Sequence, residues 1–166
     1  MGALDSACNR TCTGSDWLHS FLTVLRATAP KEVVDLVRSE PEHETFRFGN
    51  GGTQVSNERW RLPTVVGGGI ICFWTSVVPV ASLGLLLGRD FLEAVGAVMD
   101  FSRRALRCDH LDGIETPLNQ LAAGHYALRL LPDRWRGLGA QKWRRFGLDG
   151  IVEVCLLYTS PSPRDA

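Results

Sequence analysis

The feature that most constrains the fold is a long alternating stretch around a glycine-rich turn. In "ETFRFGNGGTQVSNERWRLPTVV" (residues 44–66), apolar and polar side chains alternate on both sides of "GNGG" (residues 49–52). Alternation with a period of two predicts half-buried strands, and glycines supply the positive φ angles that tight hairpin turns require. The stretch therefore predicts a β-hairpin and, with it, a fold in which sheets dominate.

Two amphipathic helices are expected before this hairpin. Apolar residues recur at helical spacing in "SDWLHSFLTVLRA" (residues 15–27), which predicts a helix with Ser15 as its N-cap. The residues expected on its buried face are Trp17, Leu18, Phe21, Leu22 and Leu25. Pro30 ends this helix, and "KEVVDLVRS" (residues 31–39) predicts a second, shorter one.

Further strands and one more helix are expected after the hairpin. Residues 67–79 are rich in β-branched and aromatic side chains, and residues 83–88 form a short apolar run that ends in glycine, so both predict strands. Asp90 and Glu93 then form a potential capping box at the start of a helix that Gly96 ends. The expected buried stripe of this helix is Phe91, Leu92, Val95 and Met99. Residues 97–109 predict strand, turn and strand, and residues 124–132 predict the last strand.

Composition and charge restrict the class of protein. The chain has 166 residues, of which 45% are hydrophobic, so it can bury one core and is expected to form one domain, or one domain plus a tail. Its 18 basic and 18 acidic residues give no net charge, which makes nucleic acid an unlikely partner. The longest apolar stretch (residues 77–88) is too short to cross a bilayer and contains proline and glycine, so we expect no association with membranes.

The cysteines indicate a reducing environment. Five are scattered along the chain, and no secretory signal precedes them. We therefore expect an intracellular, cytoplasmic protein. Cys8 and Cys12, with His19 nearby, could suggest a metal site, but the sequence offers no second pair of ligands. Small buried thiols are the preferred interpretation, and we expect no metal and no cofactor.

Three motifs stand in a characteristic order. The first is an apolar strand that ends in Asp-Ser-Ala (residues 5–7), and the second is the glycine-tipped hairpin. The third is "LLGRD" (residues 86–90), an apolar strand that ends in Gly-Arg-Asp and leads into a helix. Each motif alone is common in proteins, and only their order and spacing are informative.

Together these motifs resemble the retroviral-type aspartic proteases (retropepsins), in particular those of copia-type retrotransposon polyproteins. The family signature of two apolar residues, Asp, Thr or Ser, and Gly or Ala is matched by residues 3–7, and the flap hairpin by residues 46–56. The late apolar-apolar-Gly-Arg-Asp/Asn element is matched by residues 86–90. The resemblance covers about residues 2–132. It implies a mainly β, half-barrel acid-protease fold, with a helical insertion before the flap and a short helix after Gly-Arg-Asp.

The chemistry of such enzymes accounts for the residue types. Two carboxylates that share one proton can activate water and polarise a peptide carbonyl without a metal. The chain contains a single Asp-Ser-Ala, and the other candidate, Asp100, lacks small residues after it. The pair is therefore expected to form across a homodimer, with Asp5 from each copy on the two-fold axis, as in the resembled family.

The resemblance also assigns roles to the residues around Asp5. Ser6 would hydrogen-bond across the dimer axis, and Ala7 would keep the loop tight in place of the usual glycine. The flap would close over an extended peptide substrate, and its residues are Phe48, Gly49, Asn50, Gly51 and Gly52. Structural support is expected from Gly88, Arg89 and Asp90.

One position departs from the family pattern. Arg89 usually pairs with an acid four residues beyond the catalytic aspartate, and here that position is Asn9. We expect Arg89 to hydrogen-bond Asn9 or to turn to another acid.

The expected function is that of an aspartic endopeptidase which cleaves its own retroelement polyprotein, and the resemblance implies that it could act within retroelement particles as well as in the cytoplasm. The alternative is an inactive retroelement-derived fragment with the protease fold that serves only in dimerisation or peptide binding. A Cys/His or Ser/His hydrolase lacks support, because His110 and His125 have no nucleophile nearby in the sequence.

The two ends of the chain are expected to differ from the domain at residues 1–132, which the resemblance implies is truncated at its N-terminus. Residues 133–154 form a basic linker or the start of another region. Within them, residues 133–147 are basic and aromatic, which permits nucleic-acid binding but is more typical of a solvated linker. Residues 155–166 resemble a translated sequencing adapter, so we expect the natural C-terminus to be missing.

Overall fold

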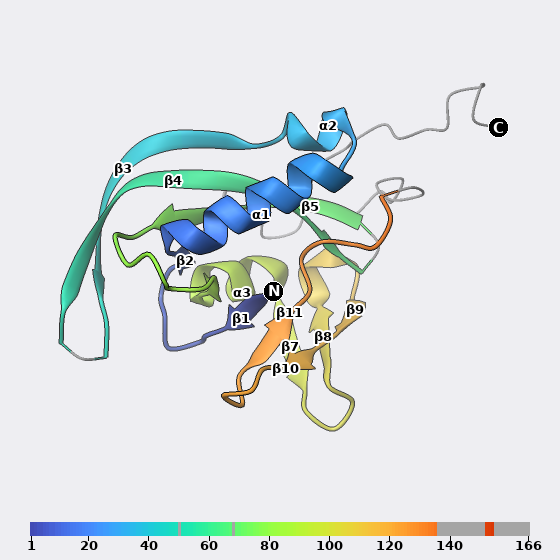
Figure 1. Cartoon of the computed structure of the whole chain (residues 1–166). Helices are drawn as coiled ribbons and strands as arrows, with labels where there is room; N and C mark the ends of the chain where they lie inside the picture. The colour runs from blue at the N-terminus through green and yellow to red at the C-terminus, as the bar shows by residue number, and fades with distance from the viewer. Residues whose placement is uncertain (50, 68, 136–151, 155–166) are drawn as a thin grey trace.

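The computed structural model describes residues 1–49, 51–67, 69–135 and 152–154 (Figure 1). Across these residues the protein is mainly β, with mixed sheets and few helices, as expected. Asn50, much of the basic segment, and residues 155–166 lie outside the described residues, and so do the expectations that concern them.

The larger sheet joins strands from both ends of the described chain. Its hydrogen-bonded order is β10-β11-β1-β6-β2-β5-β4-β3, and β12 pairs with β5 beside this path. Apart from β3 and β4, its strands are β1 (Gly2–Leu4), β2 (Cys12–Thr13), β5 (Gly69–Val77), β6 (Leu86–Leu87), β10 (Asn119–Gln120), β11 (Tyr126–Leu128) and β12 (Val152–Val154). Since β1 and β6 are parallel while most other pairs are antiparallel, the sheet is mixed.

The glycine-tipped stretch forms a long hairpin of β3 (Arg38–Arg47) and β4 (Thr53–Val66), which confirms the prediction. Its turn is closed by hydrogen bonds between Phe48 and Gly52 and between Gly51 and Phe48, and Gly51 has a φ of 82°. The strands separate from the rest of the molecule toward this turn, which lies at the lower left of Figure 1. Gly49, Gly51 and Gly52 at the turn are exposed, so these glycines are held mainly by the two strands of the hairpin.

The hairpin begins earlier than the sequence predicts, at the expense of the second helix. α2 spans only Lys31–Val34, although a helix was expected over residues 31–39. Arg38 already pairs with Arg61 of β4, and the Arg61 side chain donates a hydrogen bond to the carbonyl of Leu36. Pairing with a distant strand thus overrides the local helical pattern.

α1 (Ser15–Thr28) agrees with the expected helix except at its first residue. Leu18, Phe21, Leu22 and Leu25 are buried as predicted, and Trp17 is half-buried. The N-cap is Gly14 rather than Ser15, because the backbone of residue 14 lies against the carbonyls of Val80 and Ala81. A side chain at that position would collide with this neighbouring loop, so the close approach selects glycine there.

A second, three-stranded sheet follows α3 (Arg89–Val95). It contains β7 (Ala97–Asp100), β8 (Ala105–Cys108) and β9 (Ile114–Pro117), in that order, and a 3₁₀ turn (Asp109–Leu111) lies between β8 and β9. Gly96 ends α3 in the left-handed region with a φ of 64°, as predicted. Met99 therefore lies in β7 and not in the helical stripe, where Phe91 and Val95 are buried and Leu92 is half-buried.

One apolar core joins the two sheets and the helices. It contains the buried face of α1, the centre of β5, Phe91 of α3 and Leu106 of β8. Phe73 and Phe91 meet edge to face with ring centroids 5.9 Å apart. Trp135 also belongs to this core, although the sequence places it in a solvated linker, and β12 pairs with β5.

Candidate functional site

The site is built on a strand that lies between two others. β6 pairs in parallel with β1, through Ala3 with Leu86 and Leu4 with Leu87. On its other side Leu86 pairs with Cys12 of β2. Since β1 and β2 are joined by residues 5–11, which we call the aspartate loop, β6 passes between the two strands that carry this loop. The first and third sequence motifs are thereby brought together.

Asp5 begins the aspartate loop in a tight turn. Its backbone N–H donates to the carbonyl of Leu87 at 3.0 Å, which fixes it at the end of β6. Its carboxylate Oδ1 accepts a hydrogen bond from the N–H of Ala7 at 3.1 Å, and its carbonyl accepts one from the N–H of Cys8 at 3.2 Å. Asp5 is half-buried, whereas Ser6 and Ala7 are exposed. The Asp-Ser-Ala segment thus forms a compact turn on the surface.

Gly88 lets the aspartate loop lie against the start of α3. The N–H of Arg89 donates to the carbonyl of Cys8 at 2.8 Å, and the N–H of Asp90 donates to that of Asn9 at 3.2 Å. A Cβ at position 88 would lie 2.6 Å from the carbonyl carbon of Arg10 and 2.8 Å from the Cys8 oxygen. Only glycine permits such close contact between the two backbones.

Asp90 holds the loop rather than capping the helix with Glu93, which corrects the expected capping box. α3 begins at Arg89 with Gly88 as N-cap, and the Asp90 carboxylate faces Thr11. Its Oδ1 accepts hydrogen bonds from the N–H and the hydroxyl of Thr11, at 2.9 and 2.7 Å. The same hydroxyl accepts from the N–H of Gly88 at 3.1 Å. Thr11 is buried and was not predicted as a site residue, because its partners are distant in the sequence.

Arg89 contacts both of the partners expected for it. Its guanidinium lies 3.4 Å from the Oδ1 of Asn9 and 3.3 Å from the Oε1 of Glu93, one turn along α3. These side chains are exposed, so the contacts add little to stability. The arginine therefore connects the loop to the helix without a carboxylate at position 9.

The hairpin packs on the aspartate loop through apolar side chains. Phe46, near the end of β3, is buried against Cys12 and Val78, and Phe48 and Cys8 lie at the edge of this cluster. The first residue of the predicted flap thus lies beside the loop. Gly49 and the other described glycines of the turn are exposed, and nothing surrounds the position of a Cβ at Gly49 or Gly51.

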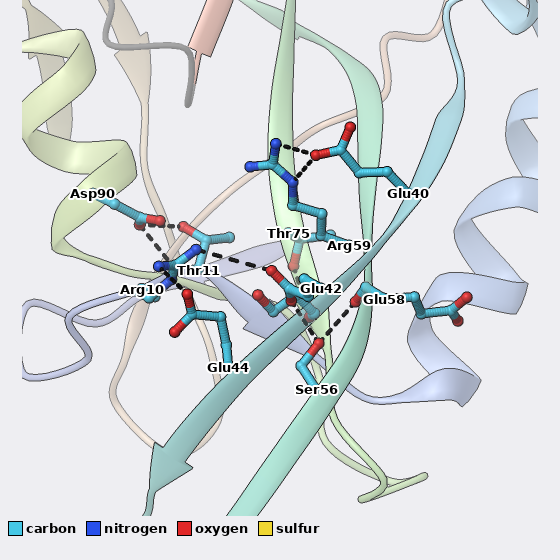
Figure 2. Close-up of polar contacts among 11 residues, drawn as sticks. Arg10, Thr11, Glu40, Glu42, Glu44, Ser56, Glu58, Arg59, Thr75 and Asp90 are labelled. Atoms are coloured by element: carbon cyan, nitrogen blue, oxygen red, sulfur yellow. Dashed lines mark hydrogen bonds and ion pairs between the residues drawn. The ribbon is translucent and has the colours of Figure 1, made fainter.

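A polar bridge connects the same two elements (Figure 2). The Nη1 of Arg10 lies 3.0 Å from the Oε1 of Glu44, and its Nη2 lies 3.9 Å from the Oε2 of Glu42. Both acids belong to β3. Arg59 pairs separately with Glu40 and lies over the ring of Trp74, so that pair connects hairpin strands to one another and to β5. No part of the bridge was predicted from the sequence.

The thiol of Cys8, in the aspartate loop, contacts the thiol of Cys12, the first residue of β2. The hydrogen bond from Cys12 lowers the pKa of Cys8 to about 7, although partial burial opposes this change. The same hydrogen bond, together with burial, raises the pKa of Cys12. Cys8 also lies 2.8 Å from the carbonyl oxygen of Arg10. The free thiol of Cys8 is the more acidic of the two and is only half-buried.

The other candidate residues lie elsewhere. Asp100 ends β7 in the smaller sheet, where it accepts hydrogen bonds from Ser102 and Arg103, and these contacts lower its pKa. The Nδ1 of His110 lies 3.1 Å from the Ala94 carbonyl, and His125 is exposed. Within the described ranges, no group of three or more His, Cys, Asp or Glu side chains is placed to bind a metal ion.

No family model and no curated protein matches the chain. Among the helices that the structure describes, none has the length and apolar character needed to cross a membrane.

Proposed function

We propose that the chain is a retropepsin-like aspartic endopeptidase that acts as a homodimer on extended peptides, its own retroelement polyprotein among them. The observation that carries the proposal is the position of β6 between β1 and β2. It unites the Asp-Ser-Ala and Leu-Leu-Gly-Arg-Asp motifs in one substructure, with Asp5 in a surface turn. The half-barrel fold of that family is part of the same proposal.

The proposed reaction requires two aspartates. In the dimer, the carboxylate of one Asp5 takes a proton from water while the protonated Asp5 of the partner donates a hydrogen bond to the substrate carbonyl. Water adds to the carbonyl carbon, the C–N bond breaks, and the leaving amine receives the proton that the first Asp5 took from water. Because the two acids share one proton, they titrate as a unit. Exposure of Ser6 and Ala7 is compatible with a partner that approaches this turn.

The hairpin is proposed to cover the substrate. Its end already packs on the aspartate loop through Phe46, Phe48 and Cys8, which supports a place for the hairpin over a peptide bound near Asp5. Backbone groups of an extended hairpin can pair with an extended peptide as another strand does. Closure of such an element over the peptide would exclude water from the reacting bond.

The test compares Asp5→Asn with Asp100→Asn. Each protein is incubated with a library of quenched fluorescent octapeptides at mildly acidic pH, with and without pepstatin. We expect pepstatin-sensitive cleavage by the parent and by Asp100→Asn, and a rate at least about 10³-fold lower for Asp5→Asn, since the acid–base group is lost. Circular dichroism checks that both variants are folded.

Two results would contradict the proposal. Pepstatin-insensitive cleavage that persists in Asp5→Asn would exclude Asp5 as the catalytic acid. A folded parent that dimerises and binds peptides but cleaves none of them would support the alternative, a binding or dimerisation module with the same fold.

A further inference from the structure

The polar bridge between the aspartate loop and the hairpin has an unusual partner in Glu42. The side chain of Glu42 is only 9% exposed, whereas those of Arg10 and Glu44 are 39% and 37% exposed. The Ser56 hydroxyl of β4, fully buried, lies 2.6 Å from the Oε1 of Glu42. A nearly buried carboxylate is costly without a cationic partner. Arg10 is the cation that the structure supplies.

A break in the β3–β4 register accompanies the placement of Glu42. Pairing is regular from Arg38 to Pro41 and again from Glu44 to Arg47, with an irregularity between Pro41 and Glu44. Bulges of this kind change the direction in which a side chain points and increase the local twist. Here Glu42 lies beside Ser56 and Arg10, at the level where the hairpin meets the aspartate loop (Figure 2).

The other end of the bridge is fixed firmly. Arg10 directly precedes Thr11, whose N–H and hydroxyl are held by the Asp90 carboxylate of α3. Hydrogen bonds and ion pairs therefore run from α3, through the aspartate loop, to both strands of the hairpin.

We propose that Arg10 is a positioning residue that couples the hairpin to the aspartate loop through Glu42 and Glu44. This inference rests on the proposed function for its catalytic meaning, since it makes Arg10 set the height of the flap above the peptide. The coupling itself is a property of the fold. Arg10 is not proposed to contact the substrate.

The first experiment measures the coupling by amide hydrogen exchange with mass spectrometry. In Arg10→Gln, we expect peptides from residues 44–56 and from residues 5–11 to exchange about three- to tenfold faster than in the parent. Glu44→Gln, which keeps Glu42 paired, should give a smaller increase. Arg38→Gln is the matched control. Arg38 is an exposed residue of β3, the strand that carries Glu42 and Glu44, and it has no ion pair in the part of the chain described.

A double variant separates positioning from a general loss of stability. Arg10→Gln leaves Glu42 as an unpaired, nearly buried charge, and Glu42→Gln removes that charge while it keeps a partner for Ser56. We therefore expect Arg10→Gln with Glu42→Gln to exchange more slowly in the hairpin than Arg10→Gln alone. Equal exchange in the two proteins would contradict the role given to Glu42.

The second experiment is steady-state kinetics on a peptide that the parent cleaves. We expect Arg10→Gln to raise KM severalfold more than it lowers kcat, because the flap is misplaced while both copies of Asp5 are intact. Unchanged hairpin exchange in Arg10→Gln, relative to Arg38→Gln, would overturn the coupling whatever the activity. If the parent has no peptidase activity but the hairpin of Arg10→Gln still exchanges faster than that of the parent, the coupling is retained and only the proposed function is rejected.

Discussion

At the scale of single residues, glycine and small polar side chains decide whether the aspartate loop can form. Gly88 lies under the backbone of Cys8 and Arg10, and the hydroxyl of Thr11 both accepts from Gly88 and donates to Asp90. Neither role depends on the chemistry of catalysis. They fix the path of the backbone on which Asp5 lies.

Gly88→Ala tests this close packing. Its methyl group would lie 2.6–2.8 Å from backbone atoms of Arg10 and Cys8, so one of the two segments must move. We expect the free energy of unfolding in urea to fall by about 1–3 kcal/mol. Gly84→Ala is the matched control, because nothing lies within 4 Å of the added methyl group. Equal stability of the two variants would contradict the structure at this point.

The contact between the thiols of Cys8 and Cys12 gives a pH-dependent prediction. The pKa of Cys8 is lowered to about 7 by the Cys12 hydrogen bond, and only the thiolate reacts with iodoacetamide. Its alkylation rate should therefore rise about tenfold per pH unit below 7 and level off above it. In Cys12→Ser the midpoint is expected to change, and peptide mapping identifies the labelled residue. A rate that keeps rising about tenfold per pH unit up to pH 8, as for an ordinary thiol with a pKa of about 8.5, would exclude the lowered pKa.

At the scale of elements, the short strands form only because they pair with neighbouring strands. β6 and β2 contain two residues each, too few to be stable alone, yet β6 is bonded to strands on both of its sides. The long hairpin is the opposite case, since its alternation is strong enough to be visible in the sequence. The junction of β6 and α3 with the aspartate loop depends on a few hydrogen bonds between elements.

Thr11→Val tests that junction. Valine has nearly the same shape, but it leaves the N–H of Gly88 without its acceptor and removes one donor from the Asp90 carboxylate. We expect a loss of about 1–3 kcal/mol in the free energy of unfolding, as for other buried polar groups that lose a partner. Thr23→Val, whose exposed hydroxyl bonds only within α1, should have a far smaller effect. If Thr11→Val and Thr23→Val lost similar amounts of unfolding free energy, Thr11 would act through packing alone.

At the scale of the whole molecule, the proposed chemistry requires a second copy of the chain. Each copy contributes one Asp-Ser-Ala turn, and the exposure of Ser6 and Ala7 leaves that turn accessible to a partner. Activity that depends on such an assembly rises faster than in proportion to protein concentration until the dimer is saturated.

Sedimentation and rate measurements on one dilution series test this dependence. We expect the specific peptidase activity to fall with dilution in parallel with the dimer fraction. Mixing excess Asp5→Asn protein with the parent should inhibit it, because mixed dimers contain one catalytic aspartate. A strictly monomeric protein whose specific activity is constant across the series would reject the shared pair.

The sequence by itself determined the elements with strong local patterns. The hairpin about its glycine turn, the buried face of α1, the end of α3 at Gly96 and the strand–turn–strand of β7 and β8 all follow from periodicity and from glycine. These features depend on residues close together in the chain, where propensity and spacing act directly.

Only the tertiary structure decided how the candidate site is assembled. Periodicity contains no information on distant partners, so the local pattern predicted too long a helix at α2 and a capping role for Asp90. Thr11 and the Arg10–Glu42 bridge were invisible for the same reason. The insertion of β6 between β1 and β2 brings these groups together, because hydrogen bonds between strands far apart in the chain form only when the whole core is packed.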